Sequence, residues 1–141
     1  MTIEAGLTDS FRLELLQAGH DFDNDTFYLA LYTGQADLLQ TSTAYQTSFE
    51  VSGAGYTAGG NEAVIVSTSI HNGVAVVEIA DVDWPSLTAT VRAGMLYNTT
   101  NGNASVCVID FGLDINKAQT DFKVIMPTAT ANEALIRLRR G

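Results

Sequence analysis

The sequence predicts a mainly β protein, a single antiparallel β-sandwich domain over residues 1–141 with one N-terminal helix. About seven short segments have the alternating or continuously apolar pattern of strands, turn residues separate them at fairly regular spacing, and only the first stretch has a helical period. Strands and helices do not alternate, which excludes doubly wound α/β folds. We expect a jelly-roll or immunoglobulin-like arrangement, with the helix at about 8–18 and the sandwich at about 26–139.

The first two expected elements are a helix and a central strand. Apolar residues recur at intervals of four and three from Leu7 to Ala18, and Gly19 is well placed to end the helix. The first turn can be capped by Thr8, Asp9 or Ser10. The segment TFYLALY at 26–32 is rich in aromatic and branched residues on both faces, which is typical of a strand covered on both sides.

A polar excursion and a glycine-rich run follow this strand. Residues 34–48 are rich in Thr, Ser and Gln, and a loop of this length in a compact domain is usually functional or packed against a partner. Residues 53–58 match the G-x-G-x-x-A spelling of a nucleotide-binding fingerprint. Because the run leads into a strand pattern and not a helix, we interpret it as a turn that needs left-handed backbone and close packing.

Two hairpins are expected in the middle of the chain. Residues 63–70 and 74–80 alternate, and Asn72-Gly73 between them favours the positive φ angles of a type I′ turn. A second pair of strands, at 88–98 and 105–111, is joined by a turn rich in Asn, Gly and Thr.

Proline and glycine delimit the remaining segments. We expect Trp84-Pro85 to close a short segment, because proline cannot donate to a sheet ladder. The last part of the chain is expected to form a loop at 112–120, a strand at 121–126 stopped by Pro127, and a terminal strand at 134–139.

The charge of the chain is negative and unevenly distributed. The net charge of −9 argues against binding to nucleic acid, and a charged fraction of only 16% indicates that another chain covers part of the surface. Residues 1–116 carry −12 and residues 117–141 carry +3, with Arg137, Arg139 and Arg140 at the basic C-terminal end. This basic end either docks one copy on another surface or guards a solvated sheet edge.

The ends and apolar stretches of the sequence argue against secretion and membrane insertion. Residues 1–6 contain Glu4 and no cation, and no apolar run follows that could serve as a signal peptide. The longest apolar stretches, 27–31 and 74–77, are far shorter than the ~20 residues of a membrane helix. The single cysteine, Cys107, lies in an apolar run and is expected to be buried.

No pattern in the sequence predicts catalysis, a cofactor or a metal. His20 and His71 have no Cys or second His at ligand spacing, so a zinc site is not expected. The tract Asp21–Asp25 lacks the central Gly and distant Glu of a calcium loop, so we favour a solvated turn, with a weakly held divalent ion as the alternative. No nucleophile elbow occurs and no nucleophile and base can be paired, so an enzyme is not expected.

Aromatic and basic residues are the candidates for contacts with other molecules. Asp81 and Asp83 beside Trp84 could bind sugar, whereas an isolated Trp is more typical of a sheet edge or a subunit contact. The candidate assembly contacts are Tyr56, Trp84, Arg137, Arg139 and Arg140.

The order of segments along nearly the whole chain is informative. It runs through a helix at 11–22, DTFYLALYTG at 25–34, Thr43-Ala44-Tyr45, EVSGAGYTAGGN at 50–61, DVDWPSLTATVRAGMLYN at 81–98 and VCVIDFG at 106–112. Together these segments resemble a widespread group of small structural proteins of tailed bacteriophages and prophages. The resemblance implies a virion component with no catalytic residues to carry over.

Three functions are compatible with these observations. The leading expectation is a capsid decoration or cement protein, a homo-oligomer such as a trimer, which binds the major capsid protein across neighbouring capsomers. Such a protein would join the virion in the cytoplasm of the bacterial host. The first alternative is a neck, tail or baseplate component. The more distant one is a carbohydrate-binding module that uses Trp84 and Tyr56.

Overall fold

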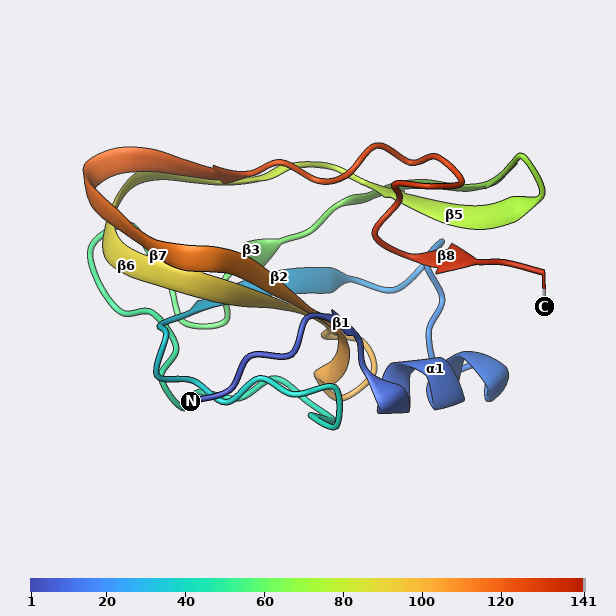
Figure 1. Cartoon of the computed structure of the whole chain (residues 1–141), viewed down its shortest axis with the longest axis horizontal. Coiled ribbons are helices and arrows are strands. Elements are labelled where there is room, and N and C mark those ends of the chain that lie inside the picture. Colours follow the sequence, from blue (N-terminus) through green and yellow to red (C-terminus); the bar gives the residue numbers. More distant parts are fainter. Residues whose placement is uncertain (141) are drawn as a thin grey trace.

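A computed structural model describes residues 1–140 as two antiparallel sheets and one helix (Figure 1). The five-stranded sheet has the order β1-β7-β6-β2-β3, and the three-stranded sheet has the order β4-β5-β8. The elements are β1 (Gly6–Leu7), α1 (Asp9–Leu16), β2 (Phe27–Tyr32), β3 (Asn61–Glu62), β4 (Ile65–His71), β5 (Val74–Ile79), β6 (Val82–Asn98), β7 (Ala104–Val124) and β8 (Arg137–Leu138). The predicted β-sandwich with one N-terminal helix is confirmed.

The hairpin of β6 and β7 supplies strands to both layers of the sandwich. Its two strands leave the five-stranded sheet together, curl at one end of the molecule and return above that sheet (Figure 1). Near the hairpin turn, residues 93–98 of β6 pair with residues 104–110 of β7, and at the other end 82–84 pair with 122–124. The hairpin therefore folds over itself, and the core lies between its two halves.

An insertion in β7 allows the hairpin to bend. The register shifts between the pairs Val91↔Ile115 and Ala93↔Asp110, and Gly112 in the extra segment has a φ of 84°. The expectation of a loop at 112–120 was wrong, because β7 resumes pairing with β6 at Ile115. Bulges bend strands and increase their twist, so this one fits the change of layer.

Pro85 lies inside β6, so the expectation that it closes a segment was also wrong. The register shifts between Trp84 and Leu87, which places Pro85 and Ser86 in a bulge. The backbone N–H of Ser86 donates to Asp121 Oδ1 at 3.0 Å. Proline is tolerated at a bulge, because there its missing N–H removes no ladder hydrogen bond.

The chain after β7 is less regular than expected. The strand predicted at 121–126 ends at Val124, and the terminal strand predicted at 134–139 is reduced to the two residues of β8. β8 pairs with β5 through Ala75↔Leu138 and Val76↔Arg137. The segment before β8 is attached to β4 where the backbone N–H of Ala131 donates to His71 Nδ1 at 3.0 Å.

The predicted hairpin of β4 and β5 is confirmed. Asn72 and Gly73 have φ angles of 51° and 79°, the two positive values that a type I′ turn requires. The strand before the turn runs from Ile65 to His71, slightly shorter than expected.

The predicted helix is present and begins where a cap was expected. Thr8 Oγ1 accepts a hydrogen bond from the backbone N–H of Phe11 at 3.3 Å, and Phe11 is the buried residue of α1. The helix ends at Leu16, and the N–H of Gly19 donates to the carbonyl of Glu14 at 2.8 Å. Of the candidate caps, Thr8 is therefore the one that the structure uses.

His20 attaches the segment after the helix to the five-stranded sheet. Its side chain is fully buried, with Nε2 at 2.9 Å from Glu14 Oε1 and Nδ1 at 3.0 Å from Asn98 Nδ2. Because the Asn98 amide donates to Nδ1, Nε2 carries the proton and donates to Glu14. His20, with both ring nitrogens hydrogen-bonded, is thus part of the scaffold.

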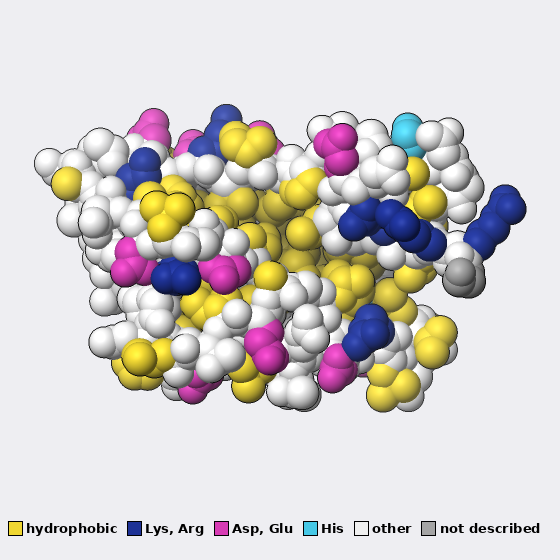
Figure 2. All heavy atoms as spheres, in the orientation of Figure 1, with side chains coloured by type: hydrophobic (Ala, Val, Ile, Leu, Met, Phe, Trp, Pro, Cys, Tyr) yellow, Lys and Arg dark blue, Asp and Glu magenta, His cyan; other side chains and the backbone are white. Residues whose placement is uncertain are grey.

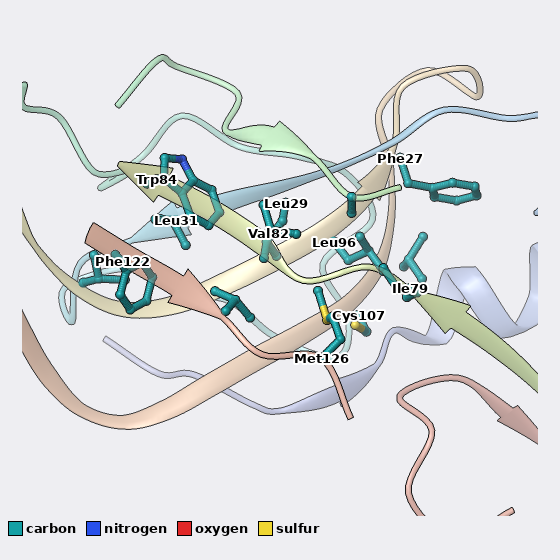
Figure 3. Close-up of a cluster of buried hydrophobic side chains, with 14 of the residues drawn as sticks. Phe27, Leu29, Leu31, Ile79, Val82, Trp84, Leu96, Cys107, Phe122 and Met126 are labelled. Carbon is teal, nitrogen blue, oxygen red and sulfur yellow. The ribbon is translucent and has the colours of Figure 1, made fainter. Parts of the chain in front are cut away.

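Side chains from both layers fill the core (Figure 3). Trp84 and Phe122, from the returning half of the hairpin, lie beside Leu31 of β2, and their ring centroids are 6.0 Å apart. Cys107 and Met126 lie together at the other end of this cluster. The fold of the hairpin is therefore held by apolar contacts between its own two halves and β2.

The outer edge of β2 is covered by the segment 49–63. The backbone N–H groups of Val51 and Ala63 donate to the carbonyls of Leu31 and Phe27, each at 2.9 Å. Tyr56 Oη accepts from the N–H of Leu31 at 3.0 Å. This segment thus closes one edge of the five-stranded sheet.

Gly60 allows this segment to approach β2. Its φ is 83°, and a Cβ at this position would lie 1.8 Å from the carbonyl oxygen of Leu29. A Cβ at Gly53 would lie 2.1 Å from the carbonyl oxygen of Thr88 in β6. The interpretation of the glycine run as a closely packed turn is confirmed.

Replacement of Gly60 by alanine should destabilise the protein strongly. We expect Gly60→Ala to lower the free energy of unfolding by at least about 2 kcal/mol, because the methyl group would overlap the Leu29 carbonyl at a positive φ. Gly102→Ala is the matched control, since Gly102 has a φ of 56° but a Cβ there meets no atom within 4 Å. It should cost about 1 kcal/mol. Urea denaturation measures both, and equal losses would contradict the role of close approach.

Candidate functional site

An apolar groove of about 300 Å³ opens between the two layers on the side of β7. Figure 2 shows hydrophobic side chains gathered in this hollow in the middle of one face of the molecule. The groove is lined by Ile109, Phe111, Ile115, Phe122, Lys123, Val124, Ile125, Met126, Pro127 and Leu135. An open apolar surface of this kind is typical of a site for another protein.

Positive charges lie along the groove. Lys123 is part of its wall, and Arg137 and Arg139 line an adjoining hollow of about 450 Å³ that shares Leu135 with the groove. None of these three cations forms an ion pair with an acidic side chain among residues 1–140. The Arg137 guanidinium donates to the carbonyl of Asn132. We call Lys123, Arg137 and Arg139 the basic rim.

The outer edge of β7 is open next to the groove. β1 pairs with β7 only through Gly6↔Val108 and Leu7↔Cys107. Beyond this point, within the part of the chain that the structure describes, residues 109–124 pair with β6 on one side and have no strand on the other. An open strand edge carries unpaired N–H and C=O groups that can accept a further strand.

The predicted basic contacts divide between two places. Arg137 and Arg139 belong to the rim of the groove. Arg140 lies with Arg139 beside a different hollow of about 530 Å³, next to Asn72 and Gly73 in the turn between β4 and β5. The basic C-terminal residues therefore do not form one compact patch.

Trp84 is not at a surface, which corrects its prediction as an assembly contact. Its side chain has 0% exposure because the returning half of the hairpin folds it into the core. Within residues 1–140, its indole N–H is the one buried side-chain polar atom with no hydrogen-bond partner. A sugar platform or a subunit contact needs an exposed ring, so Trp84 in this structure supplies neither.

Tyr56 is partly buried and is used by the chain itself. Its hydroxyl donates to Glu50 Oε2 at 2.5 Å, and the same oxygen accepts from the N–H of Gly59 at 2.8 Å. Tyr45 donates to Glu50 Oε1 at 2.6 Å. The ring centroids of Tyr56 and Trp84 are 6.4 Å apart. The polar and apolar parts of Tyr56 both hold the segment that covers β2.

Four of the five tyrosines belong to the neighbourhood of Glu50. Burial and the hydrogen bond to Glu50 raise the pKa of the Tyr45 and Tyr56 hydroxyls well above its ordinary value. Burial likewise raises the pKa of Tyr32, and it raises the pKa of Tyr97 to about 12. The hydroxyls are therefore neutral hydrogen-bond donors over the physiological range.

The Asp21–Asp25 tract forms a hydrogen-bonded turn, as the favoured interpretation expected. Asp21 Oδ1 accepts from the N–H of Asp23 at 3.0 Å, and its Oδ2 accepts from Asn24 Nδ2 at 2.7 Å. The bond from Asn24 lowers the pKa of Asp21. Asp25 Oδ2 accepts from the N–H of Asp21 at 3.0 Å and from Asn98 Nδ2 at 2.8 Å. Among residues 1–140 no three His, Cys, Asp or Glu side chains are grouped as metal ligands.

Cys107 is buried in the core, as predicted. Desolvation raises the pKa of its thiol to about 12. A thiol held neutral in this way is a poor nucleophile.

The residues that form the groove were missed in the sequence. Phe111, Leu113 and Ile115 alternate, but Gly112 and the polar residues after it indicated a loop and concealed the continuation of β7. Lys123 falls in the strand expected at 121–126, and nothing in that pattern places it beside a groove. The alternation through the supposed loop was the one signal that could have revealed the long edge.

Comparison with models of protein families, with curated proteins and with solved structures finds no match. Within residues 1–140, no helix has both the length and the apolar character that a membrane crossing requires.

Removal of the Tyr56 hydroxyl tests the hydrogen bonds around Glu50. We expect Tyr56→Phe to lower the free energy of unfolding by about 1–3 kcal/mol, because a Glu50 oxygen and the N–H of Leu31 both lose a partner. Tyr28→Phe is the matched control, since the Tyr28 hydroxyl has no hydrogen bond to another residue in 1–140. Urea denaturation of both variants decides; a cost for Tyr28→Phe as large as for Tyr56→Phe would refute this role.

Stability should fall in alkali. The folded protein keeps its buried tyrosines neutral, with a pKa of about 12 for Tyr97, whereas the unfolded chain ionises at the ordinary value of 10.0. Their contribution is therefore complete below pH 10.0 and is lost as the pH rises toward about 12. Cys107 acts in the same direction from its ordinary value of 9.0. Denaturation at a series of pH values, with tyrosinate absorbance, measures the effect, and full ionisation of the folded protein near pH 10.0 would disprove it.

Proposed function

We propose that this chain is a structural protein of a tailed bacteriophage particle, and specifically a decoration protein of the capsid. The observation that carries the proposal is the face on which an apolar groove, an open strand edge and the basic rim occur together. Apolar surface supplies binding energy, an open edge supplies directional hydrogen bonds, and unpaired cations steer an acidic partner. The resemblance of the segment order to phage structural proteins supports the same conclusion.

A decoration protein acts through binding alone. Its partners would be the major capsid protein and neighbouring copies of this chain, in a homo-oligomer such as a trimer. A protein that binds only the mature shell stabilises that shell by mass action, in proportion to its affinity and concentration. The rigid sandwich would hold the groove in a fixed shape for this contact, and the chain would reside in the virion.

A neck, tail or baseplate component is the alternative within the same particle. The groove and edge would serve either location equally, and the number of copies separates them. The carbohydrate-binding alternative lost its main support, because the Trp84 ring on which it depended is buried.

Counting copies in purified particles tests the proposed function. Quantitative mass spectrometry of virions from a phage that encodes this chain should find it in a ratio to the major capsid protein that corresponds to a coat over the whole shell. Particles that lack it should lose their DNA at a lower temperature than complete particles. A few copies per particle would move the chain to the neck or tail. Absence from purified particles would overturn the proposal.

A further inference from the structure

We propose that copies of this chain associate head to tail, with the open edge of β7 in one copy paired with the open edge of β4 in the next. The inference deepens the proposed function, on which it rests for its biological setting, because it identifies how the homo-oligomer forms. It concerns a surface of the isolated protein, so it can be tested without a phage particle.

Two long strand edges of this chain are open. In the described residues, β4 pairs only with β5, so the opposite side of residues 65–71 has no strand, and the outer side of residues 109–124 in β7 is open as well. The edge of β2 is different, because the chain covers it with its own segment 49–63. Proteins usually cover or interrupt an exposed edge, and two uncovered edges in one chain can pair with each other.

Apolar side chains accompany both open edges. Val66 and Ile70 of β4 are 55% and 72% exposed, and Ile125, in the wall of the groove, is 68% exposed. Burial of such side chains between copies would remove them from water and add to the backbone hydrogen bonds of the new strand pair.

The net charges beside the two edges have opposite signs. β7 contains Asp110, Asp114 and Asp121 as well as Lys117 and Lys123, but Arg92 pairs with Asp110 and Asp114. The basic rim of Lys123, Arg137 and Arg139 lies along the groove next to β7. Acidic groups lie beside β4, where Asp23 Oδ1 accepts from Thr68 Oγ1 and Glu78 Oε1 accepts from Ser67 Oγ, each at 3.4 Å.

These charges select one of the possible pairings. Two β7 edges would bring the two basic rims together, and two β4 edges would bring the carboxylates of Asp23 and Glu78 together. Pairing of β7 with β4 places opposite charges against each other, so it is the favoured combination. A contact between two different surfaces is heterologous, and repetition of it gives a ring when the rotation closes.

Charge reversal tests the pairing in the purified protein by sedimentation velocity over a range of concentrations. The rim variant is Arg137→Glu with Arg139→Glu, and the β4 variant is Asp23→Lys with Glu78→Lys. Each should raise the dissociation constant at least about tenfold, because like charges then face each other. The four substitutions together should restore self-association, since the attraction is reversed but present. Arg12→Glu, on α1, is the control for the single rim variant Arg137→Glu: both change the net charge equally, and Arg12→Glu should leave association intact.

Hydrogen exchange provides an independent readout of the edges. Outer amides of β4 and β7 should become protected as the concentration of the wild-type protein rises, and in the rim variant they should stay unprotected. Circular dichroism and the unfolding midpoint verify that each variant is folded. A folded rim variant that associates like the wild type would overturn the proposal, as would protection confined to other strands.

The alternative occupants give different results. A wild-type protein that stays monomeric at millimolar concentration would overturn the self-pairing. If the wild-type protein is monomeric and the rim variant is absent from phage particles, the groove binds another virion protein instead of a second copy. Self-pairing in solution together with absence from particles would instead contradict the proposed function and leave the head-to-tail contact standing.

Discussion

The fold depends on one constraint: the β6–β7 hairpin must change layers while its two strands stay paired. A strand that left the ladder at the bend would expose backbone groups with no partner, at a cost of the order of 1–3 kcal/mol for each buried group. The insertion around Gly112 and the bulge at Pro85 and Ser86 provide the change in direction without ending either strand. The core between the layers, the curled shape and the groove all follow from this bend.

The chain covers the two edges of the five-stranded sheet to different extents. On the β2 side, Glu50 gathers two tyrosine hydroxyls and the Gly59 N–H, and the segment it organises closes the edge. On the β7 side, within residues 1–140, the two residues of β1 and a single bridge from Ala44 to Ala104 cover the start of the edge, and apolar side chains farther along remain open to solvent. A partly buried polar network thus closes one edge of the sheet, and most of the other edge stays available.

The sequence was sufficient for features set by local chemistry. Asn72-Gly73 determines its turn through its own φ angles, and Thr8 caps the helix from three residues away. The sequence was insufficient for features that depend on contacts between residues far apart in the chain. Pro85 and Gly112 are local signals for a strand end, so the sequence predicts a break in β6 and another in β7. In the structure, pairing between these two strands continues on both sides of each position. The burial of Trp84 is likewise a result of the returning hairpin, and the groove exists only because that hairpin bends.

The position of Cys107 gives this protein an internal chemical reporter. It is the only cysteine of the chain, and it lies in the core beside Met126, between the two halves of the hairpin (Figure 3). A thiol reagent can reach its sulfur only when the layers separate or the chain unfolds. The rate at which the native protein is labelled therefore measures how often the sandwich opens, without the introduction of any probe.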